Sequence, residues 1–140
     1  MYTFQQYFEE KQSVPPVLRV TIKNVGTFSA KADTGNDGYN VLHATDIVKE
    51  GDKVRFRCGK RILTKPTFGS LEISKGPQLQ EERHVIKLDV AFNGKWFRNQ
   101  PFTISDRTGM DEPVLLSKDF LAHAGIVVDP SLTSASGQIL

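Results

Sequence analysis

The chain has few of the residues and segments that mark certain classes of protein. Its 140 residues include one cysteine, Cys58, and three scattered histidines, which exclude an internal disulfide framework and a four-ligand zinc pattern. No run of about 18 apolar residues is present, so no membrane-spanning segment is expected. The first twelve residues lack the apolar core of a signal peptide. We expect a protein that is not secreted and stays in the cytoplasm or in an assembled particle.

An excess of charge of one sign is also missing. Eighteen Lys and Arg stand against sixteen Asp and Glu, a net charge of +2, which by itself indicates neither a nucleic-acid nor a membrane partner. Six cationic residues nevertheless crowd one short segment: Lys53, Arg55, Arg57, Lys60, Arg61 and Lys65. No aromatic residue is interleaved on their face, so we interpret the segment as a solvated surface. We do not expect a nucleic-acid partner, and an acidic protein partner is an equal alternative to it.

The composition that is present suits one small folded domain. Hydrophobic residues make up 39% of the chain and nine of them are Phe, enough for a single core but not for two lobes. Residues 1–16 are expected to form an N-terminal arm, because the apolar residues of 2–11 have helical spacing and Pro15-Pro16 ends any helix. Residues 17–140 are expected to form the domain.

Alternating apolar residues and turn signals predict a mainly β fold. Residues 17–23 and 27–32 form one predicted hairpin, and residues 53–63 form a second around Gly59-Lys60. Asn93-Gly94 predicts a third hairpin, and short strands are expected at 102–104, 114–116 and 126–128. Ser117 is predicted to cap one short helix that runs to about Ala124 and ends at Gly125. We expect about eight strands and this one C-terminal helix.

The tripeptide Asp33-Thr34-Gly35 directly follows a predicted strand and carries the clearest chemistry. A carboxylate at Asp33 can bind and deprotonate a water, and the Thr34 hydroxyl can hold the neighbouring backbone. Gly35 lets the chain turn sharply beside the carboxylate. The same three residues are also common in ordinary turns, so the motif needs its context.

Three segments supply that context, at 30–44, 82–108 and 113–129, and together they resemble the retropepsin-like aspartic proteases. The resemblance is strongest to a branch labelled ATP-dependent zinc proteases, through Leu42-His43-Ala44, Asp106-Arg107 with Met110, and the segment 115–121 (LLSKDFL). It implies a closed acid-protease barrel. Two residues depart from the pattern. Asn36 stands where the family usually has Ala or Ser, and Ser117 stands where it usually has Gly. The first would place a bulkier polar group beside the reacting carboxylate, and the second could crowd the turn that supports the site.

The resemblance implies an aspartic endopeptidase that acts on peptide or protein substrates. One Asp-Thr-Gly in a chain too short for a second lobe requires a homodimer or higher oligomer, with Asp33 of each chain in a shared dyad. Asp33, Thr34 and Gly35 are the expected catalytic residues. No cofactor and no metal are expected, because the histidines lack ligand spacing in spite of the label of the branch.

An exposed loop or flexible hairpin at 65–82, with few large apolar residues, is expected to cover the substrate as a flap. Gly69 and Gly76 would give it hinges, and together with Asn36 they are the predicted substrate-binding residues. Tyr2, Phe4, Phe8 and the apolar end at 137–140 are expected to pack against a second copy of the chain.

Other readings of single residues and of the whole chain stay open. His43 is expected to be a half-buried, hydrogen-bonded side chain rather than a ligand, and Asp106 and Arg107 to form an ion pair or a cap. Cys58 is expected to be an inert core thiol. For the whole chain, the alternative to a protease is a non-catalytic assembly protein with the same fold, for example a component of a virion or another oligomer.

Overall fold

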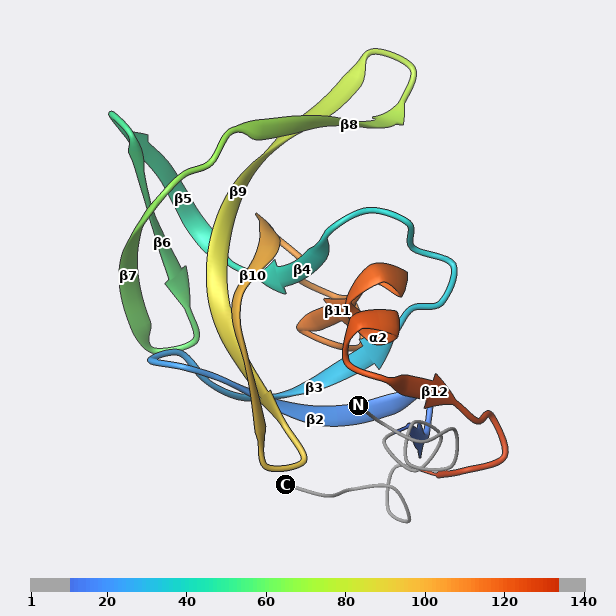
Figure 1. Ribbon diagram of the computed structural model, residues 1–140. Coiled ribbons are helices and arrows are strands. Elements are labelled where there is room, and N and C mark those ends of the chain that lie inside the picture. The colour runs from blue at the N-terminus through green and yellow to red at the C-terminus, as the bar shows by residue number, and fades with distance from the viewer. Residues whose placement is uncertain (1–10, 134–140) are drawn as a thin grey trace.

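A computed structural model describes residues 11–133, and in this range the chain is mainly β, as predicted. Within residues 11–133 the chain forms twelve strands and one short helix (Figure 1). The strands are β1 (Gln12–Val14), β2 (Val17–Ile22), β3 (Gly26–Ala32), β4 (Asn40–His43), β5 (Thr45–Glu50), β6 (Lys53–Cys58), β7 (Arg61–Pro66), β8 (Ser70–Gly76), β9 (Leu79–Phe92), β10 (Lys95–Ser105), β11 (Val114–Leu116) and β12 (Ile126–Val128). The helix is α2 (Lys118–His123).

The main sheet has seven strands in the order β10-β4-β11-β3-β2-β9-β8. Its first strand, β10, also pairs with β9 near the other end, so the pairings return to their starting strand. Parallel pairings of β11 with β3 and of β4 with β10 connect parts of the chain that are far apart in sequence. In Figure 1 the long strand β9 curves across the molecule from the β8 hairpin to the turn before β10.

Two smaller sheets flank the main one. Strands β5, β6 and β7 form an antiparallel sheet on the side away from α2 (Figure 1). Strands β1 and β12 form a parallel pair, with Gln12 beside Ile126 and Val14 beside Val128. This pair lies next to α2, which leads directly into β12.

The core is built from the alternation seen in the sequence. In β2 the buried residues are Leu18, Val20 and Ile22, and they join one apolar cluster with the buried faces of β6, β9 and β10. Phe56 and Phe102 are the largest side chains that are fully buried. Alternate residues on a strand point to opposite faces, so one face of each strand can fill this core.

The predicted turns and the helix are present. The three hairpins close at Asn24, Gly59 and Asn93-Gly94, each in the left-handed region that favours Asn or Gly. The Ser117 hydroxyl accepts a hydrogen bond from the Phe120 amide (3.2 Å) at the start of α2, and Gly125 has φ +69 just after its end. The predicted strands at 114–116 and 126–128 are confirmed.

The segment 65–82, expected to be a loop or a flexible hairpin, is mostly the β8–β9 hairpin, whose exposed strands need few large apolar residues. Other elements differ from the sequence-based prediction. The expected strand at 102–104 is the end of the single long strand β10, in which the pairing with β9 shifts between Phe97 and Gln100. Strands β1 and β5 were not predicted, and residues 11–133 contain twelve strands where about eight were expected. The residues expected to contact a second copy, Tyr2, Phe4, Phe8 and 137–140, lie outside the described residues.

Candidate active site

Asp33 is the first residue after β3 and is held in place by β11. Its amide donates a hydrogen bond to the Leu116 carbonyl (3.0 Å), which extends the parallel pairing of Leu116 with Ala32. Its carbonyl accepts from the Asn36 amide (3.1 Å), and the Asn36 carbonyl accepts from the Lys118 amide (2.9 Å). The Asp33 loop, residues 33–39, is therefore fastened to the start of α2 as well as to the sheet.

The Asn36 side chain fastens this loop from inside. Its Oδ1 accepts from the Gly38 amide (2.8 Å) and its Nδ2 donates to the Tyr39 carbonyl (3.0 Å). Asn36 also lines the hollow that contains Asp33, and its role in substrate binding stays a prediction. The departure from the family pattern at this position thus has a local structural role.

Thr34 and Gly35 are exposed, while Asp33 is half-buried. A Cβ added to Gly35 would lie 3.8 Å from Asp33 Oδ1, an ordinary contact distance. The single chain therefore leaves room for a side chain here. If only glycine is acceptable at position 35, the reason lies in what approaches Asp33 from outside the chain.

The hollow beside Asp33 has a volume of about 320 Å³. Leu71 and Ile73 of β8 and Arg83 of β9 line it, together with residues of β4, β10 and β11. The β8–β9 hairpin therefore forms one wall of the Asp33 hollow. Gly69 and Gly76 do not line the hollow. They stand at the two ends of β8, with φ +105 and +133, so their role as hinges stays a prediction.

Sequence reasoning did not select Leu71, Ile73 or Arg83 as site residues. The two apolar residues are separated by one exposed position, Glu72, which is the alternation of a strand with one covered face. That signal is short and weak, because the rest of β8 is exposed.

A group of charged side chains fixes the hairpin to the body of the protein. Glu81 lies 2.7 Å from Arg83 Nε and 3.3 Å from Lys75 Nζ, and it accepts a hydrogen bond from the Ser105 hydroxyl (2.8 Å). Burial alone would raise the pKa of Glu81, but the hydrogen bonds from Arg83 and Ser105 outweigh burial and hold this pKa below its usual value. Glu81 thus remains charged and orients Arg83 at the hollow.

Arg107 brings a second guanidinium group close to Asp33. Its Nε donates to the Glu112 carbonyl (2.9 Å), and its amide donates to His43 Nδ1 (2.8 Å). Burial and the charge of Arg83 lower the pKa of Arg107, while the charges of Glu112 and Asp33 act in the opposite direction. His43 is half-buried and hydrogen-bonded, as expected for a structural histidine.

Asp106 caps the turn that carries Arg107. Its Oδ1 accepts from both the amide (2.9 Å) and the hydroxyl (2.5 Å) of Thr108, and these bonds lower the pKa of Asp106. The expectation of a cap at this position is confirmed.

The remaining candidate ligands are dispersed. His84 is buried beside Glu82 (3.5 Å), and His123 is exposed and contacts the Phe97 ring. Within residues 11–133 no three His, Cys, Asp or Glu side chains gather as a metal site would need. Cys58 is buried, and this burial raises the pKa of its thiol, as expected for a core cysteine.

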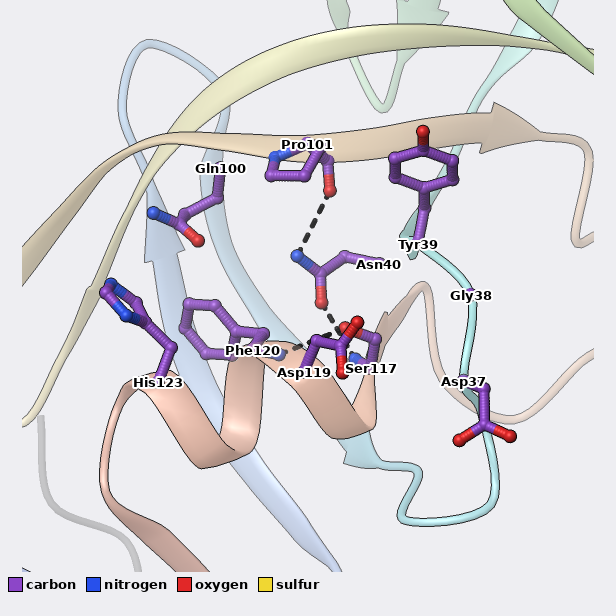
Figure 2. A pocket seen from close by; sticks show the side chains of 10 residues that line it. All are labelled: Asp37, Gly38, Tyr39, Asn40, Gln100, Pro101, Ser117, Asp119, Phe120 and His123. Atoms are coloured by element: carbon purple, nitrogen blue, oxygen red, sulfur yellow. Dashed lines mark hydrogen bonds between the residues drawn. The ribbon is translucent and has the colours of Figure 1, made fainter.

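A larger hollow of about 610 Å³ lies on the other side of the Asp33 loop, between this loop, β10 and α2 (Figure 2). At its floor the buried Asn40 amide donates to the Pro101 carbonyl (3.2 Å) and accepts from the Ser117 amide (2.8 Å). Asp33 does not line this hollow, although Gly38 and Tyr39 border both. Asn40 thus ties the loop to α2 and β10, and Ser117 fits there without crowding.

Comparison with known proteins places this arrangement in a class. The chain belongs to the RimB-like family of retropepsin-like aspartic endopeptidases. The family model, described as retropepsin-like aspartic endopeptidase RimB, matches residues 19–138. No curated protein matches the chain.

One solved structure similar to this chain is that of Lpg0085, a protein of unknown function from Legionella pneumophila subsp. pneumophila str. Philadelphia 1. The two share 26% sequence identity and superpose with a TM-score of 0.73. The match covers 89% of this chain and 97% of the other. Within residues 11–133 no helix is long and apolar enough to cross a membrane.

Proposed function

We propose that the protein is an aspartic endopeptidase that works as a homodimer, with one Asp33 contributed by each chain. The observation that carries this proposal is a half-buried carboxylate at the end of β3, fixed by β11 and opening into a hollow walled by a hairpin. Membership in the RimB-like family supports it. We take the closed circuit of pairings in the main sheet to be the acid-protease barrel.

In the proposed mechanism the two Asp33 carboxylates share one proton. Carboxylates about 3 Å apart repel by roughly 5 kcal/mol at an effective dielectric constant of about 20, so both cannot remain ionised. The ionised Asp33 removes a proton from a water, which attacks the peptide carbonyl. The protonated Asp33 donates a hydrogen bond to the oxygen of that carbonyl. The C–N bond then breaks as the nitrogen takes up a proton.

The β8–β9 hairpin supplies the cover that this chemistry needs. Leu71 and Ile73 present apolar side chains to the same hollow as Asp33, and they would shield the reacting groups from bulk water. Gly69 and Gly76 at the ends of β8 would let this strand move when substrate enters. Asn36 would contact substrate at the edge of the Asp33 loop.

Asp33→Asn tests the mechanism, because the substitution keeps the shape of the side chain and removes its ability to act as a base. We expect cleavage of denatured casein to fall at least about a thousandfold, while the melting temperature changes little. Asp52→Asn, the same chemical change at an exposed turn between β5 and β6, is the matched control.

Two results would exclude the proposal. Cleavage that persists in Asp33→Asn would remove Asp33 from the chemistry. A folded, oligomeric wild-type protein that cuts neither casein nor a peptide library would instead favour the alternative of a non-catalytic assembly protein.

A further inference from the structure

The positive charge of the chain is concentrated in the three-stranded sheet β5–β7. Residues 45–66 contain seven Lys and Arg and three Asp and Glu, a net charge of +4. Because the whole chain carries +2, the rest of the chain carries −2. This sheet lies on the side of the molecule away from α2 (Figure 1), whereas the Asp33 loop is hydrogen-bonded to the start of that helix.

The alternation of β6 separates the sheet into a buried and an exposed face. Val54, Phe56 and Cys58 are buried, whereas Lys53, Arg55 and Arg57 are exposed. Across the sheet Arg55 is paired with Val48 of β5, and Arg57 with Ile62 of β7. We call the side that carries these exposed residues the basic face.

Apolar groups are exposed on the basic face beside the arginines. Val48 is 45% exposed and Ile62 is 61% exposed. Between them lies a hollow of about 240 Å³, lined by both side chains, by Arg55 and Arg57, and by Asp46 and Phe56. A surface that combines exposed aliphatic groups with a cationic rim suits a partner that brings an apolar anchor and carboxylates.

The two arginines already have exposed acidic neighbours. Arg57 Nε lies 3.2 Å from Asp46 Oδ2, and Arg55 Nε lies 3.8 Å from Glu50 Oε1. Ion pairs between exposed side chains contribute little to stability. Carboxylates of a partner could therefore replace Asp46 and Glu50 beside the two arginines at small cost in free energy. The one aromatic residue that lines the hollow, Phe56, is fully buried and offers no surface for base stacking.

We propose that the basic face docks an acidic segment of a partner protein, with an aliphatic side chain of the segment seated between Val48 and Ile62. Carboxylates of the segment contact Arg55 and Arg57, which lie about 6.6 Å apart along β6 because alternate strand residues have this spacing. Charged contacts of this kind speed association and select the partner. The docking surface does not include Asp33 and does not depend on the proposed protease activity.

The test measures binding of a fluorescein-labelled peptide that repeats Asp-Leu-Asp. Binding is measured in the Asp33→Asn protein, so that the probe is not cut. We expect affinity to fall at least about tenfold in the double variant Arg55→Ser, Arg57→Ser, and in Ile62→Ser by a smaller factor. The charge-matched control removes two exposed cations away from the basic face, Arg19 on β2 and Lys95 on β10, and should change affinity less than about twofold.

Several outcomes would overturn the proposal. The affinity of the peptide could fall as much in the control as in the double variant of Arg55 and Arg57. Only the net charge of the protein would then matter. The affinity of the peptide could instead fall in Arg83→Ser and not in the double variant of Arg55 and Arg57. The peptide would then bind in the Asp33 hollow. A single-stranded RNA of the same net charge could bind more tightly than the peptide, which would make the basic face a nucleic-acid surface. Thermal melting of each variant checks that it is folded.

Discussion

Ser117 shows how one residue can depart from a family pattern and still serve the fold. The sequence resemblance raised the concern that a side chain here would crowd the turn into α2. The structure places its hydroxyl as the helix cap and its amide on the Asn40 side chain. A buried polar group is tolerated when it is hydrogen-bonded, and the Ser117 hydroxyl is.

We therefore expect Ser117→Ala to lower the free energy of unfolding by about 1 kcal/mol, because it removes the cap. Ser117→Gly, which restores the usual family residue, should cost only a few tenths of a kcal/mol, roughly the difference seen at other caps. Urea denaturation followed by circular dichroism measures both. A Ser117→Ala variant as stable as the wild type would mean that the cap bond does not stabilise α2.

Gly35 and Gly38 stand in the same loop but meet different surroundings. A Cβ at Gly35 finds ordinary contact distances, whereas a Cβ at Gly38 would lie 3.2 Å from Asn36 Oδ1, an atom already held by a hydrogen bond. Gly35→Ala should change the free energy of unfolding by less than about 0.5 kcal/mol, and Gly38→Ala should lower it by about 1 kcal/mol.

Activity should follow the opposite order for these two glycines. Gly35→Ala adds a methyl group beside Asp33 where substrate and a second chain approach, so cleavage should fall at least about tenfold. Gly38→Ala should affect cleavage less than stability. Casein cleavage and urea denaturation of both variants measure the two effects, and a fully active Gly35→Ala enzyme would contradict this account of the site.

At the scale of the element, Glu81 connects the β8–β9 hairpin to the end of β10. Its folded pKa is lowered, so the charged form stabilises the folded protein above the ordinary pKa of about 4.5. This stabilisation is lost as the pH falls through the lowered folded pKa. The side chain is 21% exposed, so the hydrogen bonds from Arg83 and Ser105 are only partly screened by water.

Wild type should therefore be more stable than Glu81→Gln by about 1 kcal/mol at pH 7, and this difference should narrow as the pH drops below about 4.5. Urea denaturation at pH 7 and at several lower pH values measures the difference. Glu72→Gln, the same change at an exposed position of β8, is the control. A difference that stays constant with pH would mean that the Glu81 charge contributes nothing.

The elements that sequence reasoning found are those with a local signal. Asn93-Gly94 and Gly59 predict hairpins because few residues accept a positive φ. Strand β5 has no such signal. Asp46 adopts φ +52 and the pairing with β6 shifts between Thr45 and Val48, so apolar and polar residues do not alternate regularly. Strand β10 was divided in the prediction for a similar reason, because Asn99 has φ +54 where its register shifts.

At the scale of the whole molecule, the site is assembled by contacts that no local pattern reveals. Asp33 could be predicted from three adjacent residues and their place after a strand. Arg83 and Arg107 reach the same region only because β9 and the turn after β10 are brought there by the main sheet. Parallel pairs such as β3 with β11 have no connecting turn to announce them. The sequence thus predicts the candidate reacting group, Asp33, but not the charges around it.

The remaining question at this scale is whether two chains make one active site, and mixing of subunits answers it. In the proposed dimer each site needs two Asp33 carboxylates, so a dimer of one wild-type and one Asp33→Asn chain should be inactive. When the two proteins are mixed in equal amounts and allowed to exchange, about a quarter of the dimers are wild type on both sides, which halves the activity per wild-type chain. Larger excesses of Asp33→Asn should reduce that activity further, in proportion to the remaining wild-type fraction.

The mixing experiment separates a shared site from mere association. Activity per wild-type chain that does not change as Asp33→Asn is added would mean that one chain carries a complete site, since no second Asp-Thr-Gly from a partner is then required. The control is the double variant Asp33→Asn, Gly35→Trp, whose large side chain should block the approach of a second chain and so leave wild-type activity intact. If that variant inhibits as strongly as Asp33→Asn, the loss comes from competition for substrate and not from shared subunits.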